Sequence, residues 1–278
     1  MRKIIVNADD LGISEEVNAR IEECINKGVI TSVSIIANAP AFEDGIRLAK
    51  KYPKISVGAH LNLVQFKPLT NADIFKSYGI VGQDGQFIMG ALFGVSINEE
   101  LQHAIFDEWD AQISKIEAYG IKPSHCDSHQ HTHTITALTE PLIQIMDKHG
   151  IARLRRKMVP SVVLLIRKKI YKHCNPRFDR IEASKRPFLS RYFHFLHIIN
   201  ESRRWNSKMG ESFLMTNCFY SFSDFYYNRS YLNLGNNSSV VEVMCHPGHR
   251  FYQEETNILK KDLSWLPKGY TLVSYNQL

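Results

Sequence analysis

Three short apolar segments, separated by stretches with helical periodicity, open the chain and restrict the folds that it can adopt. The segments at residues 3–7, 31–37 and 55–61 are rich in Ile and Val, which is typical of strands buried on both faces. The stretches between them, 14–27 and 40–51, begin with Ser14 and Pro40, two residue types that are common at helix starts. Strands that alternate with helices form parallel sheets with right-handed crossovers. The first third of the chain therefore predicts an α/β fold.

The same alternation continues toward the C-terminus after one long interruption. Residues 65–97 contain five glycines and no clear periodicity, which is typical of a functional loop. Six to eight strands alternating with helices favour a distorted TIM-type (β/α) barrel of mostly parallel strands over an open sheet. We predict one (β/α)-barrel domain over residues 1–278, with a basic helical insertion at about 157–210. Further helices are expected at 98–119, 137–149, 161–171, 188–208 and 256–265, and further strands just before residue 125 and at 152–155, 213–216, 240–245 and 270–275.

Composition is that of an ordinary globular protein, because 44% of the 278 residues are hydrophobic and 22% are charged. No stretch of about 18 apolar residues occurs, so we expect no transmembrane helix. The first residues lack the long apolar segment of a signal peptide. The five cysteines are scattered and form no C-x-x-C pair, which is typical of free thiols in a reducing compartment. We therefore expect a cytoplasmic protein.

Charge is unevenly distributed along the chain. Residues 151–210 contain 16 Lys or Arg and 3 acidic residues, which leaves 18 basic and 25 acidic residues elsewhere. The net charge of +6 thus combines a basic segment with an acidic remainder. Such a segment can face phosphate groups, an anionic membrane or nucleic acid, or it can be a solvated helical face.

Ionisable side chains stand where four of the expected strands end. They are the adjacent pair Asp9 and Asp10, then His60, the histidine cluster between His125 and His133, and His246. In a parallel barrel the carboxyl ends of the strands converge on one face, where active sites lie. An Asp and two His from separate strand ends make a three-ligand metal site with open positions for water and substrate. Two adjacent aspartates repel each other unless a cation is near, so one of the pair can bind a metal while the other acts as a base.

The histidine cluster cannot supply three ligands to one ion without crowding. His129, His131 and His133 alternate along the chain, so an extended backbone would direct them to the same side. We expect one of them to be a ligand and others to contact substrate or support the ligands. His133 is expected to lie outside the site.

Four motifs, taken together, resemble those of the YdjC-like carbohydrate deacetylases, which include chito-oligosaccharide deacetylase. The motifs occur in order and span most of the chain. They are Asn-Ala-Asp-Asp-Leu-Gly at 7–12, Val-Gly-Ala-His-Leu-Asn-Leu at 57–63, Pro-Ser-His-Cys-Asp-Ser-His-Gln-His at 123–131 and Glu-Val-Met-Cys-His-Pro-Gly at 242–248. The resemblance implies a cytoplasmic, metal-dependent hydrolase with a distorted TIM-type barrel, which removes the acetyl group from an N-acetylated amino sugar.

The resemblance also implies roles for residues at the matching positions. Asp10, His60 and His129 would bind one divalent metal ion, Asp9 would be the general base, and His246 would be the general acid. The remaining positions would contact substrate or support the ligands: Asn7, Asn62, His125, Asp127 and His131. The family is often described with magnesium, whereas two histidine ligands favour a softer ion such as zinc. The native ion is therefore left open between Mg and Zn.

The sequence is also compatible with other functions. Two His and one carboxylate also match the iron site of non-haem oxygenases, although such a site has no need of a second aspartate. The basic segment has interleaved aromatics and could bind an anionic surface or nucleic acid, but a solvated face is more common, and we expect no nucleic acid partner. It could also receive a nucleotide- or lipid-linked N-acetyl sugar. A homodimer is compatible with the sequence, which does not fix the oligomeric state.

Overall fold

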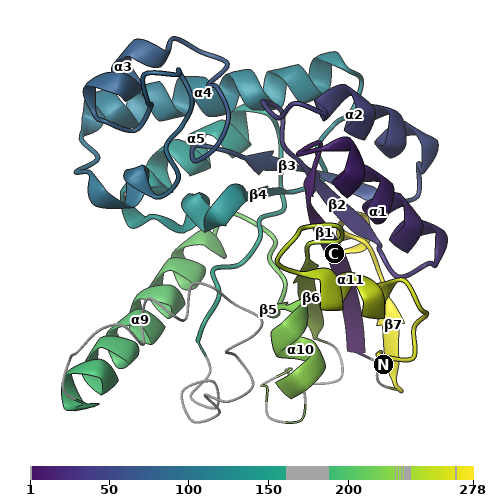
Figure 1. Cartoon of the computed structure of the whole chain (residues 1–278). Coiled ribbons are helices and arrows are strands. Elements are labelled where there is room, and N and C mark those ends of the chain that lie inside the picture. The colour runs from purple at the N-terminus through teal and green to yellow at the C-terminus, as the bar shows by residue number, and fades with distance from the viewer. Residues whose placement is uncertain are drawn as a thin grey trace.

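A curled parallel sheet forms the centre of the molecule (Figure 1). The computed structural model describes residues 2–160, 188–228, 230, 232, 234, 239–266 and 268–278. The seven described strands follow the order β4-β3-β2-β1-β6-β5, with β7 paired to β1, and all six strand pairs are parallel. The strands are β1 (Arg2–Leu11), β2 (Ser32–Ile35), β3 (Ser56–Leu61), β4 (Cys126–Ser128), β5 (Cys218–Ser221), β6 (Val240–Cys245) and β7 (Tyr270–Leu272).

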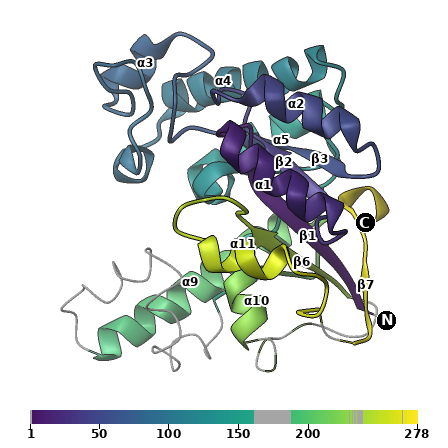
Figure 2. The ribbon, with the colours of Figure 1, turned by 45° about the vertical axis from the view of Figure 1, so that its right-hand side comes forward.

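Helices surround this sheet on its outer side, and α9 extends away from it at the lower left of Figure 1 and of Figure 2. Ser14 and Asn98 cap α1 and α4 as predicted, because their side chains accept hydrogen bonds from the amides of Val17 and Leu101. Among the residues that the structure describes, no helix combines the length and the apolar character needed to cross a bilayer. The helices are α1 (Glu15–Asn26), α2 (Phe42–Lys51), α3 (Ala72–Ser77), α4 (Glu99–Ala118), α5 (Thr139–Lys148), α9 (Phe188–Met209), α10 (Phe222–Asn228) and α11 (Gln253–Leu259).

Strand β1 is the central element of the sheet, since it pairs with β2, β6 and β7. Its residues from Ile4 to Leu11 are all buried, which explains why the segment is so rich in Ile and Val. The strand is irregular near its end: the register with β2 shifts between Ala8 and Leu11. Asp10 has a φ of 68°, in the left-handed region that non-glycine residues seldom adopt. This irregularity sets the direction of the two aspartate side chains.

Backbone hydrogen bonds connect the β4 edge of the sheet with the β5–β6 edge through two short segments. The Cys126 amide donates to Arg153, and the Leu154 amide donates to Leu214, each at 2.9–3.0 Å. The Asn217 amide then donates to Val240, at the start of β6. Isolated bridges thus connect the two sides of the curled sheet. The expectation of a distorted TIM-type α/β barrel is confirmed.

Several expected boundaries were wrong. The strands expected at 152–155 and 213–216 contain only isolated bridges, and the regular strand in this part of the chain is β5. The helix expected at 256–265 is α11, which ends at Leu259. The 65–97 segment contains the short helix α3. The helix expected at 161–171 lies outside the described residues.

The loop after β3 is attached to α4 by a buried carboxylate. Glu108 accepts hydrogen bonds from the amides of Leu69 and Thr70, at 3.0 and 2.9 Å. Gln112, one turn further along α4, bonds both the amide and the carbonyl of Asn62, at the end of β3. These bonds fix the start of the long loop relative to the carboxyl end of the sheet.

Candidate metal centre

Three predicted ligands from separate parts of the sheet meet at its carboxyl edge. Asp10 Oδ1 lies 2.8 Å from His129 Nδ1 and 3.4 Å from His60 Nε2. Their ligand atoms all lie within 4.8 Å of one another, and all three residues are buried. The residues stand at the ends of β1 and β3 and just after β4. The geometry thus brings together the set that the motifs predicted.

The donor set fits a metal ion. Asp10 Oδ1 is buried and has no hydrogen bond of good geometry in the described part of the chain, although two imidazole nitrogens are close to it. A carboxylate oxygen and two imidazole nitrogens gathered this closely are a donor set that suits a divalent ion. Burial raises the pKa of the Asp10 carboxyl, but the neighbouring His129 and His60 bring it well below its usual range. Asp10 is therefore an anion.

One candidate ligand, His60, is held in place from behind, and the other histidine, His129, begins an unusual turn. His60 Nδ1 lies 2.7 Å from Asp127 Oδ1, which is the carboxylate–histidine arrangement that orients a metal-binding imidazole. Burial lowers the pKa of His60 and the charge of Asp127 raises it, with a net rise to about 10. His129 opens a turn in which Gln130 and His131 both have left-handed φ, of 55° and 59°. Such strain persists only where the surrounding structure enforces it.

A second group of atoms also satisfies the spacing of a metal site, namely Asp9, His60 and Asp127. This group already has a cation. Arg155 donates to both oxygens of Asp9 at 2.7 Å and lies 2.7 Å from Asp127 Oδ2. Since the guanidinium occupies these carboxylates, the first group is the better metal site.

Arg155 is the centre of a buried charge cluster that sequence reasoning did not find. Its Nε also donates to Glu242 Oε1 at 2.7 Å, so one guanidinium contacts three carboxylates. Tyr275 donates its hydroxyl to the second oxygen of Glu242. Burial raises the pKa of Glu242 to about 7, against the lowering effect of Arg155. The two aspartates of the first motif therefore have different partners: Asp9 pairs with Arg155, and Asp10 with the histidines.

The residues expected to contact substrate or support the ligands are mostly fully buried. Asn7 bonds Asp9 and Ser34 at 2.8 Å. Asn62 holds the loop after β3 through the carbonyl of Gln65. Asp127 bonds His60 and the hydroxyl of Ser34. Of these three residues, only Asp127 contacts a candidate metal ligand, His60.

The remaining members of the histidine cluster differ from one another. His125 stacks on Tyr275 with ring centroids 3.7 Å apart, and burial lowers its pKa to about 3, so it is a neutral internal group. His133 bonds Ser128 and lies outside the ligand set, as expected. His131 is partly exposed and contacts Phe219. The extended backbone assumed for the cluster was wrong, because the left-handed turn redirects these side chains.

His246 lies just after β6, and its ring stacks on Tyr252 with centroids 4.7 Å apart. Its amide donates to the buried Glu255. Burial lowers the pKa of His246, although the charges of Asp10 and Asp9 act in the opposite direction. Those charges act on it because the ring stands on the same edge of the sheet as the ligands.

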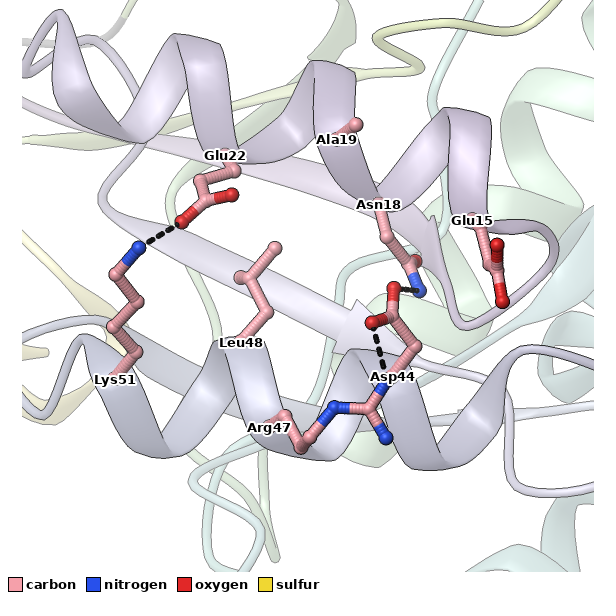
Figure 3. Close-up of a pocket in the computed structure, with 8 residues that line it drawn as sticks. All are labelled: Glu15, Asn18, Ala19, Glu22, Asp44, Arg47, Leu48 and Lys51. Atoms are coloured by element: carbon pink, nitrogen blue, oxygen red, sulfur yellow. Dashed lines mark hydrogen bonds and ion pairs between the residues drawn. The ribbon is translucent and has the colours of Figure 1, made fainter.

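A separate groove of about 490 Å³ lies between α1 and α2 (Figure 3). Four of its charged residues form two ion pairs: Lys51 with Glu22 at 2.6 Å, and Arg47 with Asp44 at 2.7 Å. Asn18 bonds Asp44 within the groove and accepts from the Gly12 amide behind it. The groove lies between two helices, and its lining residues offer no comparable set of metal ligands.

Parallel strands curled into a distorted barrel, with an Asp–His–His set at their carboxyl ends, define a barrel protein with a candidate metal centre. The chain belongs to the family of YdjC-like proteins, which it matches over residues 3–267. The resemblance inferred from the four motifs is thereby confirmed.

Curated relatives carry the name carbohydrate deacetylase. One from Halalkalibacterium halodurans is 36% identical over 148 residues, covering 52% of this chain and 59% of the relative. One from Geobacillus stearothermophilus is 38% identical over 133 residues, covering 48% and 51%. The chain thus spans between about half and three fifths of the length of these relatives. A solved structure from Enterococcus faecalis V583, named for a candidate role in cellobiose-phosphate cleavage, superposes with a TM-score of 0.68 at 21% identity, covering 99% of this chain and 98% of that one; it shows the shared fold.

Proposed function

We propose that this protein hydrolyses the acetamide of an N-acetylated amino sugar and releases acetate. The observation that carries the proposal is the convergence of Asp10, His60 and His129, with Asp9 beside them, at the carboxyl edge of the barrel. The curated relatives named carbohydrate deacetylase support a sugar substrate. One divalent ion would be held by the three ligands, and when bound it would polarise the acetamide carbonyl and acidify a water.

Asp9 is the proposed general base. Its Oδ1 accepts from Asn7 and Arg155, whereas Oδ2 accepts only from Arg155 among the described residues. A carboxylate has about four lone-pair sites, so a lone pair on Oδ2 remains to take the proton of the attacking water. Arg155 fixes the plane of the carboxylate, and general base catalysis of this kind is typically worth about 10²–10⁴-fold.

His246 is the proposed acid that protonates the departing nitrogen. Burial lowers its pKa below the usual 6.5, so the protonated fraction of the ring falls as the pH rises through that range. The acid role therefore requires the reaction rate to decrease on the alkaline side. Without that proton the nitrogen would have to leave as an amide anion, which is a poor leaving group, whereas the protonated nitrogen leaves as a neutral amine.

An acetate-release assay tests the proposal directly. The purified protein is stripped of metal and supplied with Mg or Zn, and a panel of free and phosphate-linked N-acetyl sugars is compared. We expect Asp9→Asn to keep bound metal but to lose most turnover, because the ligands are intact and the base is absent. We expect His129→Ala to lose both metal and turnover.

His103 provides the matched control, since it is an exposed histidine on α4, and His103→Ala should retain metal and turnover. An Asp9→Asn variant with full activity would refute the base assignment. Equal rates on free and phosphate-linked sugars would remove the reason to assign substrate binding to the basic segment. Acetate release that is the same with and without added metal in the stripped protein would refute the metal requirement.

A further inference from the structure

A buried tyrosine enters the barrel from the end opposite to the candidate metal centre. Tyr275 begins the short 3₁₀ turn that follows β7, and it is fully buried. Its amide donates to the hydroxyl of Ser32 at 3.2 Å, and the Asn276 amide donates to the hydroxyl of Ser56 at 3.0 Å. These two serines begin β2 and β3, so the turn is attached to the amino ends of the strands. Residues at that end of a barrel usually contribute to stability alone.

The hydroxyl of Tyr275 nevertheless reaches the buried charge cluster behind the site. It donates to Glu242 Oε2, while Arg155 Nε donates to Glu242 Oε1 at 2.7 Å. Among the described residues, these are the two donors to the Glu242 carboxylate. The other two nitrogens of Arg155, Nη1 and Nη2, donate to the two oxygens of Asp9, each at 2.7 Å. A chain of hydrogen bonds thus joins the tyrosine to the proposed general base.

The geometry of the guanidinium makes this chain depend on the hydroxyl. The pair Nε and Nη2 can hold both oxygens of one carboxylate, and the pair Nη1 and Nη2 can hold both oxygens of another. Asp9 uses the second pair, whereas Glu242 uses Nε alone, because its other oxygen is bonded to Tyr275. A buried carboxylate oxygen that loses its donor is costly, so it turns to another donor. The adjacent donor is Nη2, which also holds Asp9 Oδ1.

We infer that Tyr275 is a positioning residue for the reaction, which fixes the carboxylate plane of Asp9 through Glu242 and Arg155. This inference rests on the proposed function, because it takes Asp9 as the general base. The ring of Tyr275 stacks on His125, with centroids 3.7 Å apart and an interplanar angle of 9°. That contact restrains the ring, so the hydroxyl stays directed at Glu242.

The kinetics of Tyr275→Phe test the inference, because this variant keeps the ring against His125 and removes only the hydroxyl. We expect kcat for acetate release, measured per folded protein, to fall about tenfold, which is part of the about 10²–10⁴-fold that a general base contributes. KM and the amount of bound metal should stay unchanged, since the removed hydroxyl bonds to Glu242 and not to a candidate metal ligand. A merely structural tyrosine would instead lower stability and leave the kcat of the folded protein unchanged.

Tyr119→Phe is the matched control for the lost hydroxyl. Tyr119 also donates to a carboxylate, that of Glu43 at 2.8 Å, and its ring also packs against an aromatic ring, that of Phe42. This variant should leave kcat unchanged. The inference is refuted if Tyr275→Phe keeps kcat within about twofold of the unaltered protein, or if its loss is confined to KM or to metal binding.

Unfolding in urea supplies a second readout, which needs no turnover. The free energies of unfolding of Tyr275→Phe, Asp9→Asn and the double variant of the full chain are compared in a double-mutant cycle. Because both side chains act on Arg155, one of them through Glu242, the loss in the double variant should differ from the sum of the two single losses. Additive losses refute the inference. Non-additive losses together with no acetate release by the unaltered protein, from any sugar of the panel, refute the deacetylase alone.

Discussion

Replacing Arg155 with methionine should strongly destabilise the fold, because one buried guanidinium serves three buried carboxylates. Asp9, Asp127 and Glu242 each lie 2.7 Å from it, and each is at most 2% exposed. Removing one member of a buried ion pair typically costs about 3–5 kcal/mol. We expect a loss of at least about that size, since several charges lose their partner at once. The total stability of a domain is only about 5–15 kcal/mol.

Urea unfolding, followed by the fluorescence of the buried tryptophans, measures this loss. With an m-value of about 2 kcal/mol per molar, the midpoint should fall by about 2 M. Arg153→Met, two residues earlier on the same segment, removes a partly exposed arginine and should shift the midpoint far less. The loss in Arg155→Met should shrink at pH 5, where Glu242, with its pKa raised to about 7, is protonated in the folded protein. Equal midpoints for the two variants would refute the shared-cation reasoning.

Two further substitutions test the packing and the titration around this cluster. Gly58→Ala should destabilise the protein by about 1–3 kcal/mol or more, because the new Cβ would lie 2.4 Å from the His125 ring. That ring cannot move away, since it is stacked on Tyr275. An unchanged thermal unfolding midpoint would contradict this prediction. Burial raises the pKa of Glu255 from 4.5 to about 8, so between these values the unfolded chain releases a proton that the folded chain keeps. The free energy of unfolding should therefore fall as the pH rises through that window. In Glu255→Gln, which can still accept from the His246 amide, unfolding experiments at a series of pH values should show a smaller dependence of this free energy on pH. The same dependence in both proteins would contradict the assignment.

The grouping of Asp10, His60 and His129 could be predicted because all three stand at strand ends. Asp10, His60 and His129 are far apart in the sequence, but the carboxyl ends of parallel strands share one edge of the sheet. The apolar runs located the strands, and the ionisable residues that follow them located the site. The motif resemblance then selected one histidine from a cluster in which composition alone gave no preference.

Arg155 could have been found by the same criterion and was not. It ends the segment expected as a strand at 152–155, but it also lies near the start of the basic segment 151–210. In such a segment one arginine is easily taken for one of many surface charges. Glu242 gave a clearer signal, since an acidic residue within the run Val240–Cys245 must be paired when that strand is buried. The sequence does not indicate which residues pair with Arg155 or Glu242. The contact between Arg155 and Asp9, for example, joins positions 146 residues apart.

The prediction of an extended backbone after β4 failed for a different reason. Gln130 and His131 adopt left-handed φ without glycine, so the sequence carries no sign of the turn. An alternating row of histidines then looks like a strand with one polar face. Tertiary contacts supply the constraint, through the bonds that Ser128 makes to the backbone and ring of His133.

The adjacent aspartates of β1 show how strain and charge combine at the site. In a regular strand, successive side chains point to opposite faces, so one of the pair would face the helices. The left-handed backbone at Asp10, at a cost of about 1–2 kcal/mol, breaks that alternation and lets Asp9 reach Arg155 while Asp10 reaches the histidines. Three buried carboxylates, those of Asp9, Asp127 and Glu242, then share a single arginine, and a fourth, that of Asp10, lies beside the two histidines. Such a surplus of negative charge is costly to bury unless a further cation binds, and the ligand atoms around Asp10 are where a divalent ion would balance it.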